Sequence, residues 1–92
     1  MAWKYRITGV SAITQREPVD NETWDDLATR SADDMANLIK NSQALAQLKK
    51  EDDHRELEQI IADFECCTDL EEFNGNIEDL YDIGNFYRIF LY

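Results

Sequence analysis

The chain has 92 residues, a net charge of −11 and 43% hydrophobic residues. This size and composition predict one domain over residues 1–92 with a packed core, and they argue against wholesale disorder. The negative charge excludes direct binding to nucleic acid or to an anionic membrane, because both need a basic surface.

No apolar run reaches the ~18 residues that a membrane-spanning helix needs. The N-terminal stretch MAWKYRITGVSA has polar and charged residues where a signal peptide would be apolar, so we expect a cytoplasmic protein. Cys66 and Cys67 are adjacent, a poor geometry for a disulfide between them, which suits a reducing compartment.

The first half of the chain begins with an alternating pattern. Residues 3–10, WKYRITGV, place polar and apolar side chains on opposite faces, which predicts a half-buried strand that ends near Gly9. Pro18 and residues 20–22 indicate a loop. Residues 23–29, TWDDLAT, fit either a short helix or a second strand, and the pattern does not decide between them.

Helical signals follow from Ser31 onward. Ser31 resembles an N-cap, and Met35, Leu38 and Ile39 follow at helical spacing. Asn41–Ser42 predicts a break, after which Ser42 caps a second helical piece that ends in basic residues.

The clearest helix contains an apolar stripe at i, i+3, i+4 and i+7, formed by Leu57, Ile60, Ile61 and Phe64. Residues 68–71, TDLE, match a capping box and predict a short helix to about Phe73. Residues 74–76, NGN, indicate a turn, and a further short helix is expected to close at Gly84.

The last eight residues, NFYRIFLY, predict a strongly apolar strand. We expect it to pair with the first strand, since an unpaired apolar edge would aggregate. The expected fold is therefore α+β: a small antiparallel sheet that includes the N- and C-terminal strands, packed against three to five helices.

Motifs for catalysis and metal binding are absent from the sequence. His54 is the one histidine, and it has no second histidine or spaced cysteines to complete a zinc site. With Gly75 as the sixth position of a calcium loop, Leu70 and Tyr81 would fall where carboxylates are required. We therefore expect no enzyme activity, no cofactor and no metal site.

The negative charge is concentrated in residues 51–82, which contain thirteen acidic residues and one basic residue, Arg55. A solvated helix usually mixes the two signs, and like charges four residues apart destabilise it. We predict that these carboxylates bind a partner. They are Glu51, Asp52, Asp53, Glu56, Glu58, Asp63, Glu65, Asp69, Glu71, Glu72, Glu78, Asp79 and Asp82.

The spacing of these acids suggests an imitation of nucleic acid. Residues 51–65 have a net charge of −6 over roughly 22 Å of helix, which gives one charge per ~4 Å, close to the ~3.4 Å of a single DNA strand. A duplex-like density of one charge per ~1.7 Å would need a second acidic line, from residues 69–82 or from a partner subunit in a homodimer.

In its size, charge and acidic stretch 51–82, the chain resembles the small phage-encoded DNA-mimic inhibitors of the anti-restriction and anti-CRISPR type. That resemblance implies a basic nucleic-acid-binding partner, such as a nuclease or a CRISPR effector, whose nucleic-acid surface the protein would occupy. The basic first sixteen residues depart from a uniformly acidic mimic. The alternative is an acidic protein–protein interaction or regulatory module, anchored by aromatic residues such as Trp24, Tyr81 or Tyr87.

Overall fold

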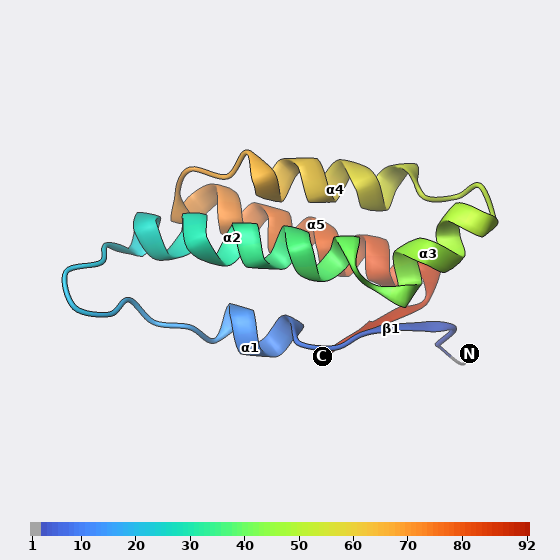
Figure 1. The fold of residues 1–92 in the computed structure, drawn as a ribbon, viewed down its shortest axis with the longest axis horizontal. Coiled ribbons are helices and arrows are strands. Elements are labelled where there is room, and N and C mark those ends of the chain that lie inside the picture. The colour runs from blue at the N-terminus through green and yellow to red at the C-terminus, as the bar shows by residue number, and fades with distance from the viewer. Residues whose placement is uncertain (1–2) are drawn as a thin grey trace.

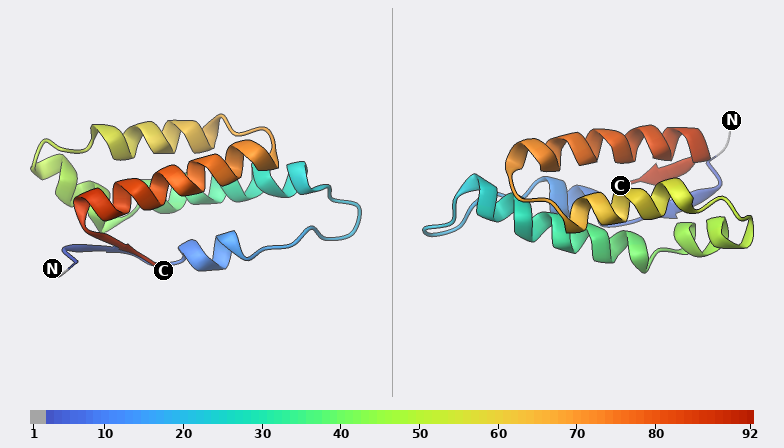
Figure 2. Two further views of the ribbon diagram at one scale, coloured as in Figure 1. Left: turned by 180° about the vertical axis from the view of Figure 1, so that it is seen from behind. Right: turned by 90° about the horizontal axis from the view of Figure 1, so that it is seen from above.

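A computed structural model describes residues 3–92 as a mainly helical molecule with a small sheet. The elements in chain order are β1 (Tyr5–Ile7), α1 (Val10–Thr14), α2 (Trp24–Lys40), α3 (Gln43–Lys50), α4 (Arg55–Glu65), α5 (Leu70–Tyr87) and β2 (Ile89–Leu91). The long helices α2, α4 and α5 lie side by side along the longest axis (Figure 1). Helix α1 and the two strands lie on the side of α2 and α5 away from α4 (Figure 2).

The molecule is mostly helical and its two short strands pair in parallel, so the predicted α+β fold with an antiparallel sheet is wrong. Tyr5 is opposite Ile89 and Ile7 is opposite Leu91. Between the strands the chain runs along α2, back along α4 and forward again along α5 (Figure 1). Three long helices of alternating direction return the chain to the starting end, so β2 must run the same way as β1. The helical body thus serves as the crossover that a parallel pair requires.

The C-terminal third of the chain is one long helix rather than two short ones. The predicted turn at residues 74–76 and the predicted stop at Gly84 both lie inside α5. The side-chain amide of Asn76 donates to the backbone oxygen of Asp63 at 3.1 Å, so this asparagine holds α5 against α4. Helix α5 ends at Tyr87, and Arg88 adopts the left-handed conformation at φ 60°, which leaves only residues 89–91 for the strand.

The ambiguous segment 23–29 belongs to α2. Thr23 and Asp26 form a reciprocal capping box, with each side chain bonded to the backbone N–H of the other. The helix therefore begins eight residues earlier than predicted, and Ser31 is a buried residue within it rather than an N-cap. The predicted break at Asn41–Ser42 is confirmed, because the Ser42 hydroxyl accepts from the N–H of Leu45 at the start of α3.

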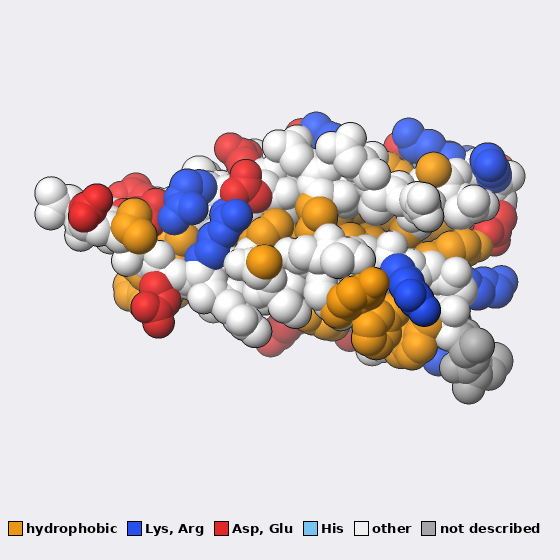
Figure 3. Space-filling model, turned by 60° about the horizontal axis from the view of Figure 1, so that its bottom comes forward, with side chains coloured by type: hydrophobic (Ala, Val, Ile, Leu, Met, Phe, Trp, Pro, Cys, Tyr) orange, Lys and Arg blue, Asp and Glu red, His pale blue; other side chains and the backbone are white. Residues whose placement is uncertain are grey.

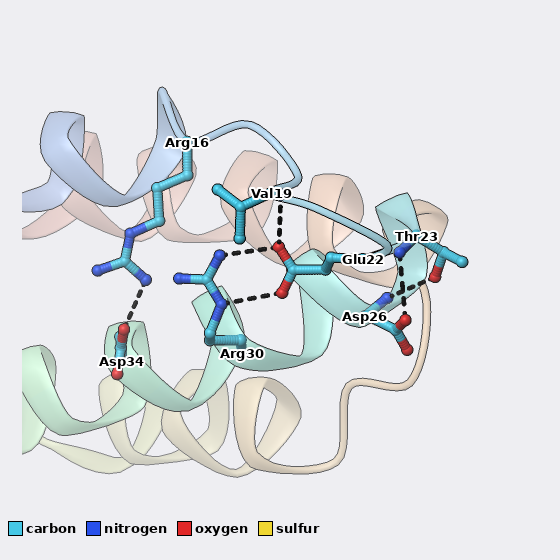
Figure 4. Close-up of polar contacts among 7 residues, drawn as sticks. All are labelled: Arg16, Val19, Glu22, Thr23, Asp26, Arg30 and Asp34. Carbon is cyan, nitrogen blue, oxygen red and sulfur yellow. Dashed lines mark hydrogen bonds and ion pairs between the residues drawn. The ribbon is translucent and has the colours of Figure 1, made fainter.

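Ion pairs fasten the connection between α1 and α2 to the surface of α2 (Figure 4). Arg16 pairs with Asp34, and Arg30 donates two hydrogen bonds of 3.0 Å to the carboxylate of Glu22. The Glu22 carboxylate also accepts from the backbone N–H of Val19. These contacts give local roles to two of the seven acids of residues 17–34, Glu22 and Asp34.

The core is built around the predicted stripe of α4. Leu57, Ile60, Ile61 and Phe64 are all buried, as predicted. The ring of Phe64 meets the ring of Phe73 of α5 edge to face, with centroids 5.9 Å apart. The other buried large apolar side chains come from every remaining element and include Ile7, Val10, Met35, Ile39, Leu48, Leu80 and Ile89.

Two glycines of α5 provide a test of this packing. A Cβ at Gly84 would lie 3.1 Å from the Leu91 side chain and 3.2 Å from the backbone oxygen of Ile89, whereas a Cβ at Gly75 would meet nothing within 4 Å. We expect Gly75→Ala to raise the free energy of unfolding by about 0.5–1 kcal/mol through helix propensity. Gly84→Ala should lower it by about 1 kcal/mol or more through overpacking against β2.

Urea unfolding followed by circular dichroism measures both changes against the wild-type protein. A stabilisation by Gly84→Ala equal to that of Gly75→Ala would show that β2 does not rest on α5.

Candidate acidic interaction surface

Helices α4 and α5 lie side by side and form a shallow groove of about 290 Å³ between them. The groove has an apolar floor from Ile60 and Ile83 and is lined by four of the thirteen predicted acids. They are Glu56 and Asp63 from α4, and Asp79 and Asp82 from α5. Two acids of residues 69–82, Asp79 and Asp82, therefore lie across the groove from acids of α4 within one chain.

The apolar stripe of α4 determines which acids line this groove. Glu56 and Asp63 are seven residues apart, so they project on the same side of the helix, with their carboxylates about 10 Å apart along its axis. Asp63 accepts a hydrogen bond of 3.1 Å from Gln59. Within residues 3–92, no lysine, arginine or histidine forms an ion pair with any of the four groove acids. Their negative charge is therefore not compensated locally.

The acids on the opposite flank of α4 are compensated. Glu65 pairs with Lys40 of α2 at 2.6 Å, and Glu58 pairs with Lys49 of α3 at 3.6 Å. His54 also lies 3.6 Å from Glu58. Glu51, which precedes α4, accepts the hydroxyl of Tyr5. Glu51, Glu58 and Glu65, which repeat every seven residues, consequently do not form a free row of charges.

Two acids at the start of α5 have capping roles. Asp69, and not Thr68, is the N-cap, and its carboxylate accepts from the N–H of Glu72 at 2.8 Å. Glu72 accepts from the hydroxyl and the backbone N–H of Thr68, which lowers the pKa of the Glu72 carboxyl because both bonds favour the charged form. This lowered pKa contributes stability above the ordinary glutamate pKa, and the contribution is lost as the pH falls through the folded-state value.

The remaining predicted acids do not line the groove. Asp52, Glu71 and Glu78 are exposed, and Asp53 accepts from the hydroxyl of Tyr87 at 3.4 Å. The pKa of Tyr87 is raised, first by burial and then by the negative charges of Glu56 and Asp53. Asp53 therefore extends the negative potential of the groove toward the C-terminal end of α5.

The helix pair approaches the charge density of one nucleic-acid strand. Residues 55–87 contain ten acids and Arg55, and Lys40 and Lys49 neutralise two of the acids, which leaves a net charge of −7. Over the roughly 27 Å length of α5 this is one charge per ~4 Å, against ~3.4 Å in a single strand and ~1.7 Å in a duplex. Residues 51–54 lie outside the helix, so α4 alone does not provide this density.

No group of three or more metal-binding side chains occurs among residues 3–92. None of the described helices is long and apolar enough to cross a membrane. Of the aromatic residues considered as anchors, Trp24 and Tyr81 are exposed, whereas Tyr87 is partly buried against the core.

Comparisons with known proteins give no relative from which a function could be transferred. No protein-family model, no curated protein and no solved structure matches the chain. The resemblance to DNA-mimic inhibitors therefore rests on the size and charge of this chain and on the arrangement of its acids.

The groove acids should repel one another in the free protein. We expect the triple variant Glu56→Gln, Asp79→Asn, Asp82→Asn to be more stable than the wild type at low salt, by a few tenths of a kcal/mol for each carboxylate removed. Urea unfolding at ionic strengths of about 0.02 M and 0.5 M measures this gain, which should shrink at the higher value because salt screens exposed charges.

The matched control is Glu17→Gln, Asp20→Asn, Asp33→Asn, which removes the same numbers of glutamates and aspartates from exposed positions outside the groove. An equal gain in both triples would mean that the repulsion reflects net charge alone and not the groove.

Proposed function

We propose that this protein is an inhibitor that imitates nucleic acid and occupies the nucleic-acid-binding surface of a basic partner, such as a nuclease or a CRISPR effector. The observation that carries the proposal is the row of uncompensated carboxylates on both sides of the α4–α5 groove. Inhibition requires no chemistry by the inhibitor, because charge matching alone blocks the partner's substrate site.

The shape of the groove suits the side chains that contact phosphates. Lysine and arginine combine an aliphatic stem with a cationic head. In the groove, the stem would lie on Ile60 and Ile83 while the head meets carboxylates from either helix. A partner that binds nucleic acid presents such side chains along its binding surface.

The charge density favours a partner surface that contacts one strand. The helix pair provides about one charge per ~4 Å, which is close to a single strand and about half of what a duplex presents. A homodimer that brings two α4–α5 grooves together would approach the charge density of a duplex. The oligomeric state therefore distinguishes a partner surface that contacts one strand from one that contacts a duplex.

The alternative function is an acidic protein–protein module without mimicry, and the exposure of Trp24 favours it. This indole is 53% exposed at the start of α2, where an aromatic anchor would be accessible. Binding through such an anchor should be insensitive to salt and should be lost on Trp24→Ala, whereas binding through the groove should depend steeply on salt.

Inhibition assays on a panel of purified restriction nucleases and CRISPR effectors test the proposal. For an inhibited enzyme, we expect the groove triple variant to bind about 10- to 100-fold more weakly, since each exposed ion pair contributes up to about 1 kcal/mol. Raising the ionic strength from about 0.05 M to 0.2 M should weaken the wild-type complex strongly.

The control triple at Glu17, Asp20 and Asp33 carries the same net charge and should retain most of the inhibition. Equal loss of inhibition in both triple variants would show that the partner is attracted non-specifically by net charge and not by the groove. Undiminished inhibition by the groove triple would refute it, and loss on Trp24→Ala instead would establish the alternative.

A further inference from the structure

The outer face of the small sheet carries a cluster of exposed aromatic rings. Trp3, Phe90 and Tyr92 surround a hollow of about 520 Å³ together with Arg6. The ring centroids of Trp3 and Phe90 are 5.9 Å apart, and those of Phe90 and Tyr92 are 4.8 Å apart. Figure 3 shows hydrophobic side chains gathered near the N-terminal end of the chain, with a basic side chain beside them. We refer to these four residues as the sheet-face cluster.

The strand register explains why these rings are exposed. Arg6 and Phe90 are register partners, and both are exposed. Their neighbours Ile7 and Ile89 are buried against the helices, so alternation along the strands sends Arg6 and Phe90 to the opposite face. The three rings are 39–43% exposed, although they are among the largest apolar side chains of the protein. Such a contiguous aromatic patch on a small domain indicates an interaction surface.

The charge around the sheet-face cluster is opposite to that of the rest of the molecule. Lys4, Arg6 and Arg88 lie on or next to the paired strands, and within residues 3–92 none of them forms an ion pair. The chain contains 20 acids, and four of its other basic residues are paired with them. The cations at the sheet are therefore left available in a protein with an excess of carboxylates.

A second groove of about 680 Å³ continues from the sheet-face cluster, and Arg6 and Tyr92 line both. It runs between β1 and the junction of α2 with α3, where its lining includes the amide side chains of Asn37, Asn41 and Gln43. Asp34 also lines it, but its carboxylate is held by Arg16. Amide side chains both donate and accept, as the backbone of an extended peptide requires.

We propose that the sheet-face cluster and the adjoining groove bind an extended acidic peptide segment of a partner protein. A large apolar side chain of that segment packs among the three rings, and a neighbouring carboxylate pairs with Arg6. Charge complementarity selects this occupant. A single-stranded nucleic acid would also stack on the rings, but it carries a phosphate at every nucleotide and would meet the repulsion of a net charge of −11 along its whole length, whereas a short peptide with one or two carboxylates meets mainly Arg6. A second copy of the chain would bring the same repulsion.

Selection from a random peptide library on the purified protein tests this proposal. We expect the enriched peptides to contain aspartate or glutamate next to tryptophan, phenylalanine or leucine. Arg6→Glu and Phe90→Thr should each weaken a selected peptide at least about tenfold, measured by fluorescence anisotropy. Both positions are exposed, and circular dichroism verifies the fold of each variant.

Matched controls replace an exposed cation and an exposed ring elsewhere. Lys50→Glu and Phe86→Ser should bind the selected peptide as the wild type does, because neither residue lines the cluster or its groove. The groove triple at Glu56, Asp79 and Asp82 should also leave peptide binding unchanged, so this test is independent of the proposed inhibitor function.

Three results would overturn the proposal. The first is enrichment of basic peptides alone, or of none, and the second is equal binding of acidic peptides to Arg6→Glu. The third is that the wild type forms a dimer, detected by light scattering, or binds labelled oligothymidylate, and that Phe90→Thr abolishes this dimer or this binding.

Discussion

The burial of one apolar stripe on α4 decides the charge pattern of the whole protein. Leu57, Ile60, Ile61 and Phe64 are packed between α2 and α5, and this packing fixes the rotation of α4 about its own axis. The acids on one flank then face Lys40 and Lys49, while those on the other flank face the acids of α5. A non-directional hydrophobic contact thus separates the acids into a compensated row and an uncompensated groove.

The sequence predicts the elements whose signals are local. The stripe of α4 and the cap at Ser42 are complete within a few residues, and both are confirmed. The parallel strands and the single helix α5 depend on contacts between distant segments, and the place of Gly84 depends on its contact with β2. The local sequence predicts a helix end at Gly84, whereas in the fold the absence of a side chain at Gly84 makes room for β2. Tertiary packing overrides turn propensity at residues 74–76 in the same way.

The sequence predicts the region that contains the candidate site, but not which acids of that region form an uncompensated surface. Thirteen acids in residues 51–82 are evident from the sequence, and so is the need for a second acidic line. The cations that neutralise Glu58 and Glu65 come from α3 and α2, outside that region, so sequence spacing cannot identify them. The sheet-face cluster is hidden for a similar reason, since alternation predicts two faces of a strand without showing which face the helices cover.

The groove carboxylates are not needed for the fold, and this follows from magnitudes. Burying each large apolar side chain of the α4 stripe contributes about 1.5–3 kcal/mol, whereas like charges on neighbouring helical positions cost a few tenths of a kcal/mol each. The stripe therefore outweighs the repulsion of Glu56, Asp63, Asp79 and Asp82 several-fold. These four carboxylates weaken the fold slightly, and the fold does not need them. Their presence is therefore best explained by a function other than folding.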